Sequence, residues 1–214
     1  NSDANLFEAW CSAAKDPDSA VRQWLLSGAP AGLLKDPEGF GTFPASNDIP
    51  EMNVDDLETD FDSFRNYAGV DQDDTTEREV AAHAKANHVR EFGSLAELVD
   101  FLDGEQPLLS RIGLIVKERN GVVKKRMILD TNASEVKSST RKGQRVILPR
   151  LLDAITQVLA LMALVDDMCT IGTDLFVLDF TEAYWQMPLH PMERKFFAAM
   201  IERGGVNLYL IFLR

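Results

Sequence analysis

Residues 176–189 read FVLDFTEAYWQMPL, and this stretch decides how the C-terminal half of the chain is interpreted. The run from Leu175 to Leu178 is continuously apolar, which is typical of a strand buried on both faces. Asp179 follows at once, and burying a carboxylate is costly unless a cation, a helix N-terminus or water lies beside it. Carboxylate oxygens are the usual protein ligands of Mg²⁺ at phosphate sites. The structural alternative is a strand-end aspartate that caps the next turn, and the residues alone leave both interpretations open.

A second informative stretch, residues 111–130, predicts a β-hairpin. One strand is expected at 112–116, Asn120-Gly121 is a strong two-residue turn signal, and 127–129 lie on the returning strand. Lys117 and Arg126 flank the turn. Such cations neutralise phosphate charge, and a hairpin tip can close as a lid over a bound triphosphate. The alternative is an exposed hairpin that its charges keep soluble.

The string Leu178-Asp179-x-x-x-Ala183-Tyr184-x-x-x-Pro188-Leu189 resembles the first palm motif of reverse transcriptases from retroviruses and LTR-type retroelements. The resemblance implies that Asp179 is catalytic and binds Mg²⁺, with the Phe180 backbone as a further candidate ligand. It implies that Tyr184 packs under the nucleotide sugar and disfavours a 2′-hydroxyl. The backbone around Glu182 and Ala183 would contact the triphosphate.

The 111–130 hairpin is similar to the fingers hairpin of the same family and comes in the family's order. The resemblance assigns triphosphate contacts to Arg126 and Lys117. It covers about residues 111–214 and implies an α+β fold, a partial fingers and palm of a right-hand polymerase. The implied partners are a dNTP and a template-primer nucleic acid. The basic residues expected to contact that nucleic acid are Lys124, Lys125, Arg141, Lys142 and Arg145.

The polymerase site is incomplete within these 214 residues. Two-metal phosphoryl transfer needs at least two carboxylates around the metals, and in this family the others come from a later Tyr-x-Asp-Asp hairpin. No such string occurs, and Asp166-Asp167 lacks the tyrosine and precedes Asp179. We therefore expect an N-terminal fragment of an RNA-directed DNA polymerase that is inactive alone. The alternative is a decayed or repurposed retroelement remnant that binds nucleic acid or a protein partner without catalysis.

Charge divides the chain, whose net charge is −12, into two unlike halves. Residues 1–105 hold 23 acidic and 7 basic residues, whereas residues 106–214 hold 11 acidic and 15 basic residues. This asymmetry predicts an acidic leader, 1–105, joined to a module with a polyanion-facing surface, 106–214. No apolar run reaches the ~18 residues of a membrane span, and neither cysteine has a partner motif, so we expect an intracellular protein, cytoplasmic or nuclear, with no membrane partner.

Periodicity and capping signals predict the remaining elements. In the leader we expect helices at 16–27, 75–92 and 94–103, with an irregular segment at 28–74. In the second half we expect a basic loop at 132–144, a helix from Pro149 to about Val165, and a hairpin around Gly204-Gly205. His83 and His88 lie five residues apart, which does not suit one helical face, so we interpret them as exposed helix residues rather than metal ligands.

Overall fold

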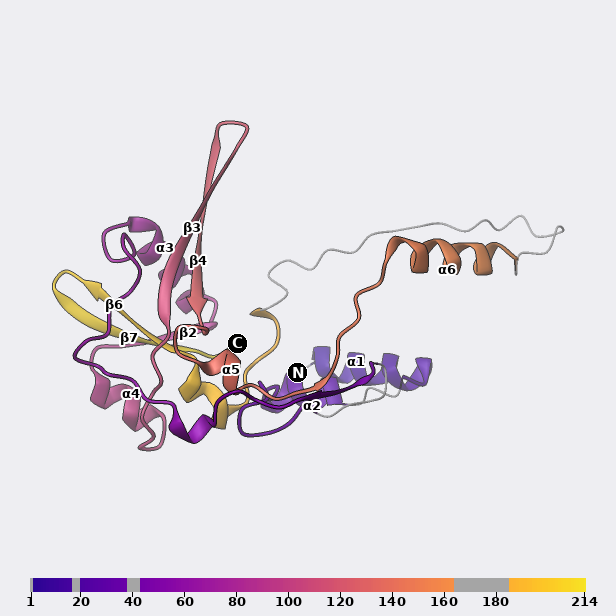
Figure 1. Cartoon of the computed structure of the whole chain (residues 1–214), viewed down its shortest axis with the longest axis horizontal. Helices are drawn as coiled ribbons and strands as arrows, with labels where there is room; N and C mark the ends of the chain where they lie inside the picture. Colours follow the sequence, from indigo (N-terminus) through magenta and orange to yellow (C-terminus); the bar gives the residue numbers. More distant parts are fainter. Residues whose placement is uncertain (1, 17–19, 38–42, 164–184) are drawn as a thin grey trace.

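Two antiparallel hairpins organise the chain, whose computed structural model describes residues 2–16, 20–37, 43–163 and 185–214. The first consists of β3 (Arg111–Arg119) and β4 (Val122–Asp130), and it projects from the body of the molecule (Figure 1). The second, β6 (Ala198–Arg203) and β7 (Val206–Phe212), joins β2 (Val89–Phe92) in a sheet of order β2-β7-β6. Helices and strands are mixed, so the protein is of the α+β class.

Both predicted hairpin turns are confirmed. Asn120 and Gly121 have φ angles of 54° and 74°, and the register pairs Arg119 with Val122. Gly204 and Gly205 likewise have positive φ angles, 60° and 78°. Positive φ at both central residues is the signature of the type I′ turn, which asparagine and glycine adopt at little cost.

The helices agree with the sequence in part. The helix expected at 16–27 is observed as α2 (Ala20–Ser27), and α1 (Ser2–Ala14) precedes it without having been predicted. The helix expected at 94–103 is α4 (Leu95–Phe101), where the Ser94 hydroxyl accepts a hydrogen bond of 3.2 Å from the Glu97 N–H. The region predicted as irregular, 28–74, contains only the strand β1 (Ala45–Asp48) and the 3₁₀ turn η1 (Val54–Asp56) among its described residues.

The predicted helix over 75–92 is wrong in its second part. The helix α3 (Asp74–Lys85) ends early, and Asn87 adopts a left-handed conformation with φ of 56°. The next residues form β2, in which Val89 and Phe92 are buried on opposite sides of the sheet while the backbone pairs with β7. Burial of these two side chains and the four-residue ladder outweigh the helix propensity of the alanine-rich sequence before them.

The second half contains two short elements that were not predicted. The expected loop at 132–144 includes α5 (Val136–Ser139) and β5 (Lys142–Gln144), which pairs with β1. The expected helix from Pro149 is observed as α6 (Leu151–Ala163), which stands apart from the body (Figure 1). Its apolar face is exposed, with 63% of Leu152 and 60% of Leu159 accessible to solvent. The strand predicted at 175–178 lies outside the described residues.

The hydrophobic core joins residues from both sides of position 105. Val80 and Val89 share one cluster with Ile112 and Leu210, all nearly inaccessible to solvent. A second cluster on the other side of the sheet joins Leu98 of α4 to residues of β6 and β7. A third, smaller cluster packs Leu33 against Val136 and against Phe196 of the 3₁₀ helix η3 (Pro191–Phe196). Segments of the acidic half therefore complete the core of the basic half.

Candidate nucleic-acid interface

The two residues predicted to contact a triphosphate lie on the same face of the β3–β4 hairpin. The register pairs Lys117 with Lys124 and Ile115 with Arg126, so Lys117 and Arg126 are diagonal neighbours. Side chains alternate between the two faces of a hairpin. The same face therefore carries five basic residues, which we call the basic face: Arg111, Lys117, Arg119, Lys124 and Arg126.

The outer part of the basic face is free to bind an anion. Lys117, Arg119, Lys124 and Arg126 are exposed, and none forms an ion pair with another described residue. Four unneutralised cations on one surface create a positive potential that attracts phosphate. Arginine suits this role because its fork of N–H donors matches phosphate oxygens.

The single carboxylate on this face is already engaged at the foot of the hairpin. Asp130 accepts a hydrogen bond of 2.5 Å from the Tyr67 hydroxyl. The Tyr67 bond, aided by backbone N–H groups of the following loop, holds the pKa of Asp130 below its usual range. The Arg111 guanidinium lies over the Tyr67 ring, 5.9 Å from its centroid. Tyr67 thus covers the base of the face and leaves its outer part open.

The opposite face of the hairpin is bound to the body. Lys125 forms an ion pair with Asp73, which also accepts a hydrogen bond of 2.8 Å from the Thr75 N–H and so caps α3. The pKa of Asp73 is lowered, chiefly by the hydrogen bond from Lys125. Met127 and Leu129 of this face pack against the core. Lys125, predicted to contact nucleic acid, therefore has a structural partner and points away from the basic face.

The Asn66 side chain positions the hairpin against the sheet. Its carbonyl oxygen accepts a hydrogen bond of 2.9 Å from the Ile112 N–H in β3. Its amide group donates to the Met200 carbonyl in β6 at 2.7 Å and to the Asp71 carboxylate at 3.3 Å. One side-chain amide thus connects β3 to β6 much as a backbone peptide group would.

The other predicted nucleic-acid contacts lie on and around β5. Arg141 forms an exposed ion pair with Asp36 at 3.4 Å. Lys142 is exposed and faces Asp48 across the β1–β5 ladder. The Arg145 N–H donates to the Pro44 carbonyl at 2.9 Å. Acidic residues accompany the first two of these cations, so the region is less positive than the basic face.

The residues mapped to the polymerase motif fall mostly outside the described part of the chain. These are Asp179, Phe180, Glu182, Ala183 and Tyr184. The end of the motif is described: the Pro188 carbonyl accepts a hydrogen bond of 2.7 Å from the Ala29 N–H, and the Leu189 N–H donates to the Leu213 carbonyl at 2.8 Å. Gly28 is required beside it, because a Cβ atom there would lie 2.4 Å from the Leu189 oxygen.

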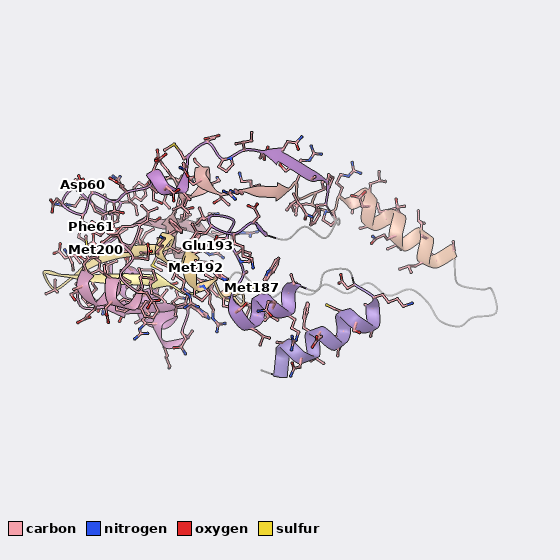
Figure 2. The ribbon with its side chains drawn as sticks, turned by 90° about the horizontal axis from the view of Figure 1, so that it is seen from below. Asp60, Phe61, Met187, Met192, Glu193 and Met200 are labelled. Carbon is pink, nitrogen blue, oxygen red and sulfur yellow. The ribbon has the colours of Figure 1, made fainter. Side chains whose placement is uncertain are left out.

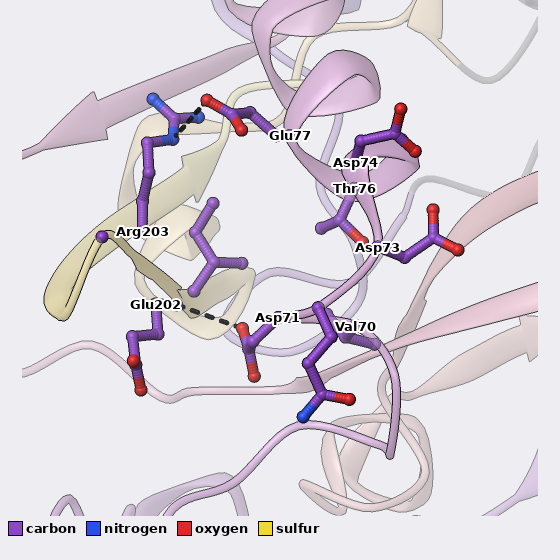
Figure 3. Close-up of a pocket in the computed structure, with 11 residues that line it drawn as sticks. Val70, Asp71, Asp73, Asp74, Thr76, Glu77, Glu202 and Arg203 are labelled. Atoms are coloured by element: carbon purple, nitrogen blue, oxygen red, sulfur yellow. Dashed lines mark hydrogen bonds and ion pairs between the residues drawn. The ribbon is translucent and has the colours of Figure 1, made fainter.

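An acidic cavity of about 250 Å³ lies between the start of α3 and the end of β6 (Figure 3). Two of the carboxylates that line it, Asp71 and Glu77, have structural partners. Asp71 accepts from the Glu202 N–H at 3.1 Å, and Glu77 pairs with Arg203 at 3.2 Å. In the described ranges, no group of three or more histidine, cysteine, aspartate or glutamate side chains could hold a metal ion.

Two histidines that were not expected to lie on one face, His83 and His88, are in contact in the structure. His83 and His88 are in contact through their Nδ1 atoms, 3.2 Å apart, and the Trp185 ring packs against both. The interpretation of His88 as an exposed helix residue is wrong, since it is buried and follows the end of α3. Asn87 is the one sequence signal that could have indicated the turn, because asparagine tolerates the left-handed conformation.

Comparison of the chain with protein-family models, with curated proteins and with solved structures gives no significant match. The resemblance to reverse transcriptases therefore depends on the two motifs themselves. Within the described residues, no helix combines the length and apolar character needed to cross a membrane.

Proposed function

We propose that this chain is part of an RNA-directed DNA polymerase in which the basic face of the β3–β4 hairpin binds phosphate groups. The observation that supports the proposal is the placement of Lys117 and Arg126 on one exposed surface, free of ion pairs within the described residues. Glu118 and Lys125 alternate onto the other face, so the sequence sorts its free cations to one side. A hairpin fixed at its foot and free at its tip suits a lid over a triphosphate.

In this proposal, chemistry depends on positioning and on neutralising charge. Asp179 would hold Mg²⁺, with the Phe180 backbone as a further ligand, and the ion would stabilise charge on the phosphates. Tyr184 would pack under the sugar, and the backbone of Glu182 and Ala183 would contact the triphosphate. Lys117 and Arg126 would orient the same group from the hairpin. The partners would be a dNTP and a template-primer, within the cell.

The alternative function is nucleic-acid binding without catalysis. The basic face favours it independently of Asp179, since its cations are available whether or not a complete metal site exists. Both functions predict that the hairpin binds polyanions. Only the first predicts that a nucleotide binds with a contribution from Mg²⁺ and Asp179.

Fluorescence anisotropy with a labelled RNA–DNA duplex tests the common step. Each phosphate contact contributes roughly 0.9 to the slope of log K against log salt on B-form DNA. The double variant Lys117→Glu/Arg126→Glu should bind at least tenfold more weakly and lower that slope by about 2. The double variant Arg78→Glu/Lys85→Glu, which reverses two exposed charges on α3, is the matched control and should change binding little. Equal losses in both variants would show that net charge, and not the basic face, governs binding.

Primer extension tests whether this chain is active alone, and dNTP binding distinguishes the two proposed functions. Because the 214 residues lack Tyr-x-Asp-Asp, we expect no template-directed extension. Extension that Asp179→Asn abolishes would contradict this expectation. Mg²⁺-dependent dNTP binding that Asp179→Asn weakens would support the polymerase proposal, whereas duplex binding without it would favour the alternative.

A further inference from the structure

A second cavity, of about 400 Å³, lies between the end of α4 and η3, and the proposed function does not use it. Small-molecule sites in proteins typically enclose about 300–1,000 Å³ and combine apolar walls with a few polar groups. This cavity has both kinds of lining. Its apolar residues are Leu34, Phe101, Leu102, Pro191 and Met192, and its charged residues are Asp103, Glu105, Arg194 and Lys195.

The walls of the cavity are held in place by contacts outside it. The buried carboxylate of Glu193 in η3 accepts a hydrogen bond of 2.7 Å from the Leu34 N–H, which fixes Leu34 relative to η3. On the other side, the Phe101 ring packs against Phe92 with 5.2 Å between centroids, and the Arg90 guanidinium lies 4.6 Å over it. A ligand would therefore enter a preformed cavity and would not have to order its walls.

Arg194 supplies an unneutralised cation to this cavity. Its side chain is half-buried, and the loss of solvent lowers the pKa of its guanidinium. The Nε atom donates to the Leu189 carbonyl at 3.3 Å, which orients the group. Among the described residues, no carboxylate forms an ion pair with Arg194, and its Nη1 and Nη2 atoms have no hydrogen-bond partner. Charged side chains that lose solvent are usually paired, and a free guanidinium fork matches the two oxygens of an anion.

The other charged groups limit the charge that a ligand can carry. Lys195 forms an ion pair of 2.6 Å with Glu105, and the pKa of Glu105 is lowered chiefly by that hydrogen bond. These two side chains neutralise each other, whereas Asp103 is exposed and forms no ion pair with another described residue. Two carboxylates in the lining repel a dianion more than a monoanion. The cavity therefore favours a single negative charge placed at Arg194.

We propose that this cavity binds a small organic monocarboxylate. Its carboxylate would pair with the Arg194 guanidinium, and its apolar body would pack against Leu34, Phe101 and Met192, where burial from water stabilises it. None of the residues that line the cavity belongs to the β3–β4 hairpin. The site is therefore separate from the basic face, and the proposal does not rest on the function proposed above.

The test uses the full chain and phenylacetate as the probe, followed by NMR. We expect saturable shifts of the amide resonances of Leu34, Leu102 and Arg194, with an affinity in the millimolar range or tighter. Phenylacetamide has the same shape without the charge, and it should bind at least tenfold more weakly because it cannot form the charge-assisted hydrogen bonds. Inorganic phosphate, which carries more charge and no apolar body, should also bind at least tenfold more weakly.

Two variants locate the site. Arg194→Gln removes the cation and should weaken phenylacetate binding at least tenfold, with Arg78→Gln, at an exposed arginine of α3, as the matched control. Because Arg194 also bonds to the Leu189 backbone, a second variant avoids that contact. Met192→Glu places a negative charge at a side chain that is 66% exposed, so it should block the anion without disturbing the core. Its matched control is Val206→Glu, at an exposed position of β7.

Four results would overturn the proposal. They are the absence of saturable shifts at these amides, equal affinity for phenylacetate and phenylacetamide, tighter binding of phosphate, and unchanged affinity in both cavity variants. Neither the probes nor the readout involve nucleotide or nucleic acid. Failure of this site and failure of the proposed function are therefore distinguishable.

Discussion

Glu193 offers the sharpest test of how the N-terminal segment is attached to the rest of the protein. Its side chain is fully buried, with 0% exposed, and lies within the body of the molecule (Figure 2). One carboxylate oxygen accepts hydrogen bonds from the N–H groups of Leu33, Leu34 and Lys35, at 2.9, 2.7 and 3.1 Å. The other oxygen accepts from the Ala31 N–H. One carboxylate thus satisfies four donors of a turn that lies about 160 residues earlier in the chain.

The substitution Glu193→Gln removes the charge while keeping the shape. The amide oxygen can still accept from three N–H groups, but the amide nitrogen then faces the Ala31 N–H, donor against donor. A hydrogen bond to a charged group stabilises by roughly 1.5–3 kcal/mol, and a buried donor without a partner costs roughly 1–3 kcal/mol. We therefore expect a loss of about 3 kcal/mol in the free energy of unfolding. Glu193→Ala leaves all four donors without an acceptor and should cost at least about 4 kcal/mol, a large share of the stability of a typical domain.

Urea unfolding followed by circular dichroism measures this loss. Glu202→Gln, which neutralises an exposed glutamate in β6, is the matched control and should change the free energy by less than about 0.5 kcal/mol. Hydrogen exchange supplies a local readout, since the amides of Leu33, Leu34 and Lys35 should exchange faster in Glu193→Gln. Stability within 0.5 kcal/mol of the control, together with unchanged exchange at these amides, would refute the reasoning.

Two further predictions concern the foot of the β3–β4 hairpin. Asn66→Ala removes the hydrogen bonds that connect β3 to β6 and leaves the buried Ile112 N–H without its acceptor. It should therefore lower the free energy of unfolding by about 2–3 kcal/mol. Asn47→Ala in exposed β1 is the control, and equal urea midpoints for the two variants would contradict a stabilising role of Asn66. Tyr67→Phe removes the hydroxyl that lowers the pKa of Asp130. A carboxylate whose pKa is lower in the folded state stabilises that state at pH values above its unfolded pKa, near 3.9. This stabilisation is lost as the pH falls through the folded-state pKa. The difference in melting temperature between wild type and Tyr67→Phe should therefore shrink from pH 6 to pH 3, and a constant difference would contradict the assignment.

The sequence predicts the hairpins well because their turns are local. Asn120-Gly121 and Gly204-Gly205 require positive φ angles that few other residue pairs adopt easily, so the turn, the register and the alternation of Lys117 and Arg126 follow together. The hairpin register in turn predicts which cations share a face, provided that the strand ends are known. The basic face is therefore the part of the candidate site most accessible from sequence.

The missed features depend on contacts between distant residues. Nothing local to Val89 and Phe92 shows that β7, more than a hundred residues later, provides their ladder. The contact between His83 and His88 depends on the same change from helix to strand, because an uninterrupted helix would carry the two rings apart. Glu193 looks like an exposed residue in a basic stretch, and its four N–H partners lie in a segment that has no strong pattern of its own.

The arrangement of charge explains why an acidic protein can present a positive surface. The acidic half neutralises only one face of the hairpin: Asp73 forms an ion pair with Lys125 on the face that packs against the body. On the other face, Tyr67 occupies Asp130, the carboxylate best placed to compete for Arg111. The remaining cations, among them Lys117 and Arg126, are left to solvent. A net charge of −12 is thus compatible with local phosphate binding. Asp73 of the acidic half binds Lys125 on the opposite face, and Tyr67 binds the one carboxylate at the foot of the basic face. Reversing Asp73 to lysine should therefore weaken anchoring of the hairpin more than it changes the affinity of the basic face for polyanions.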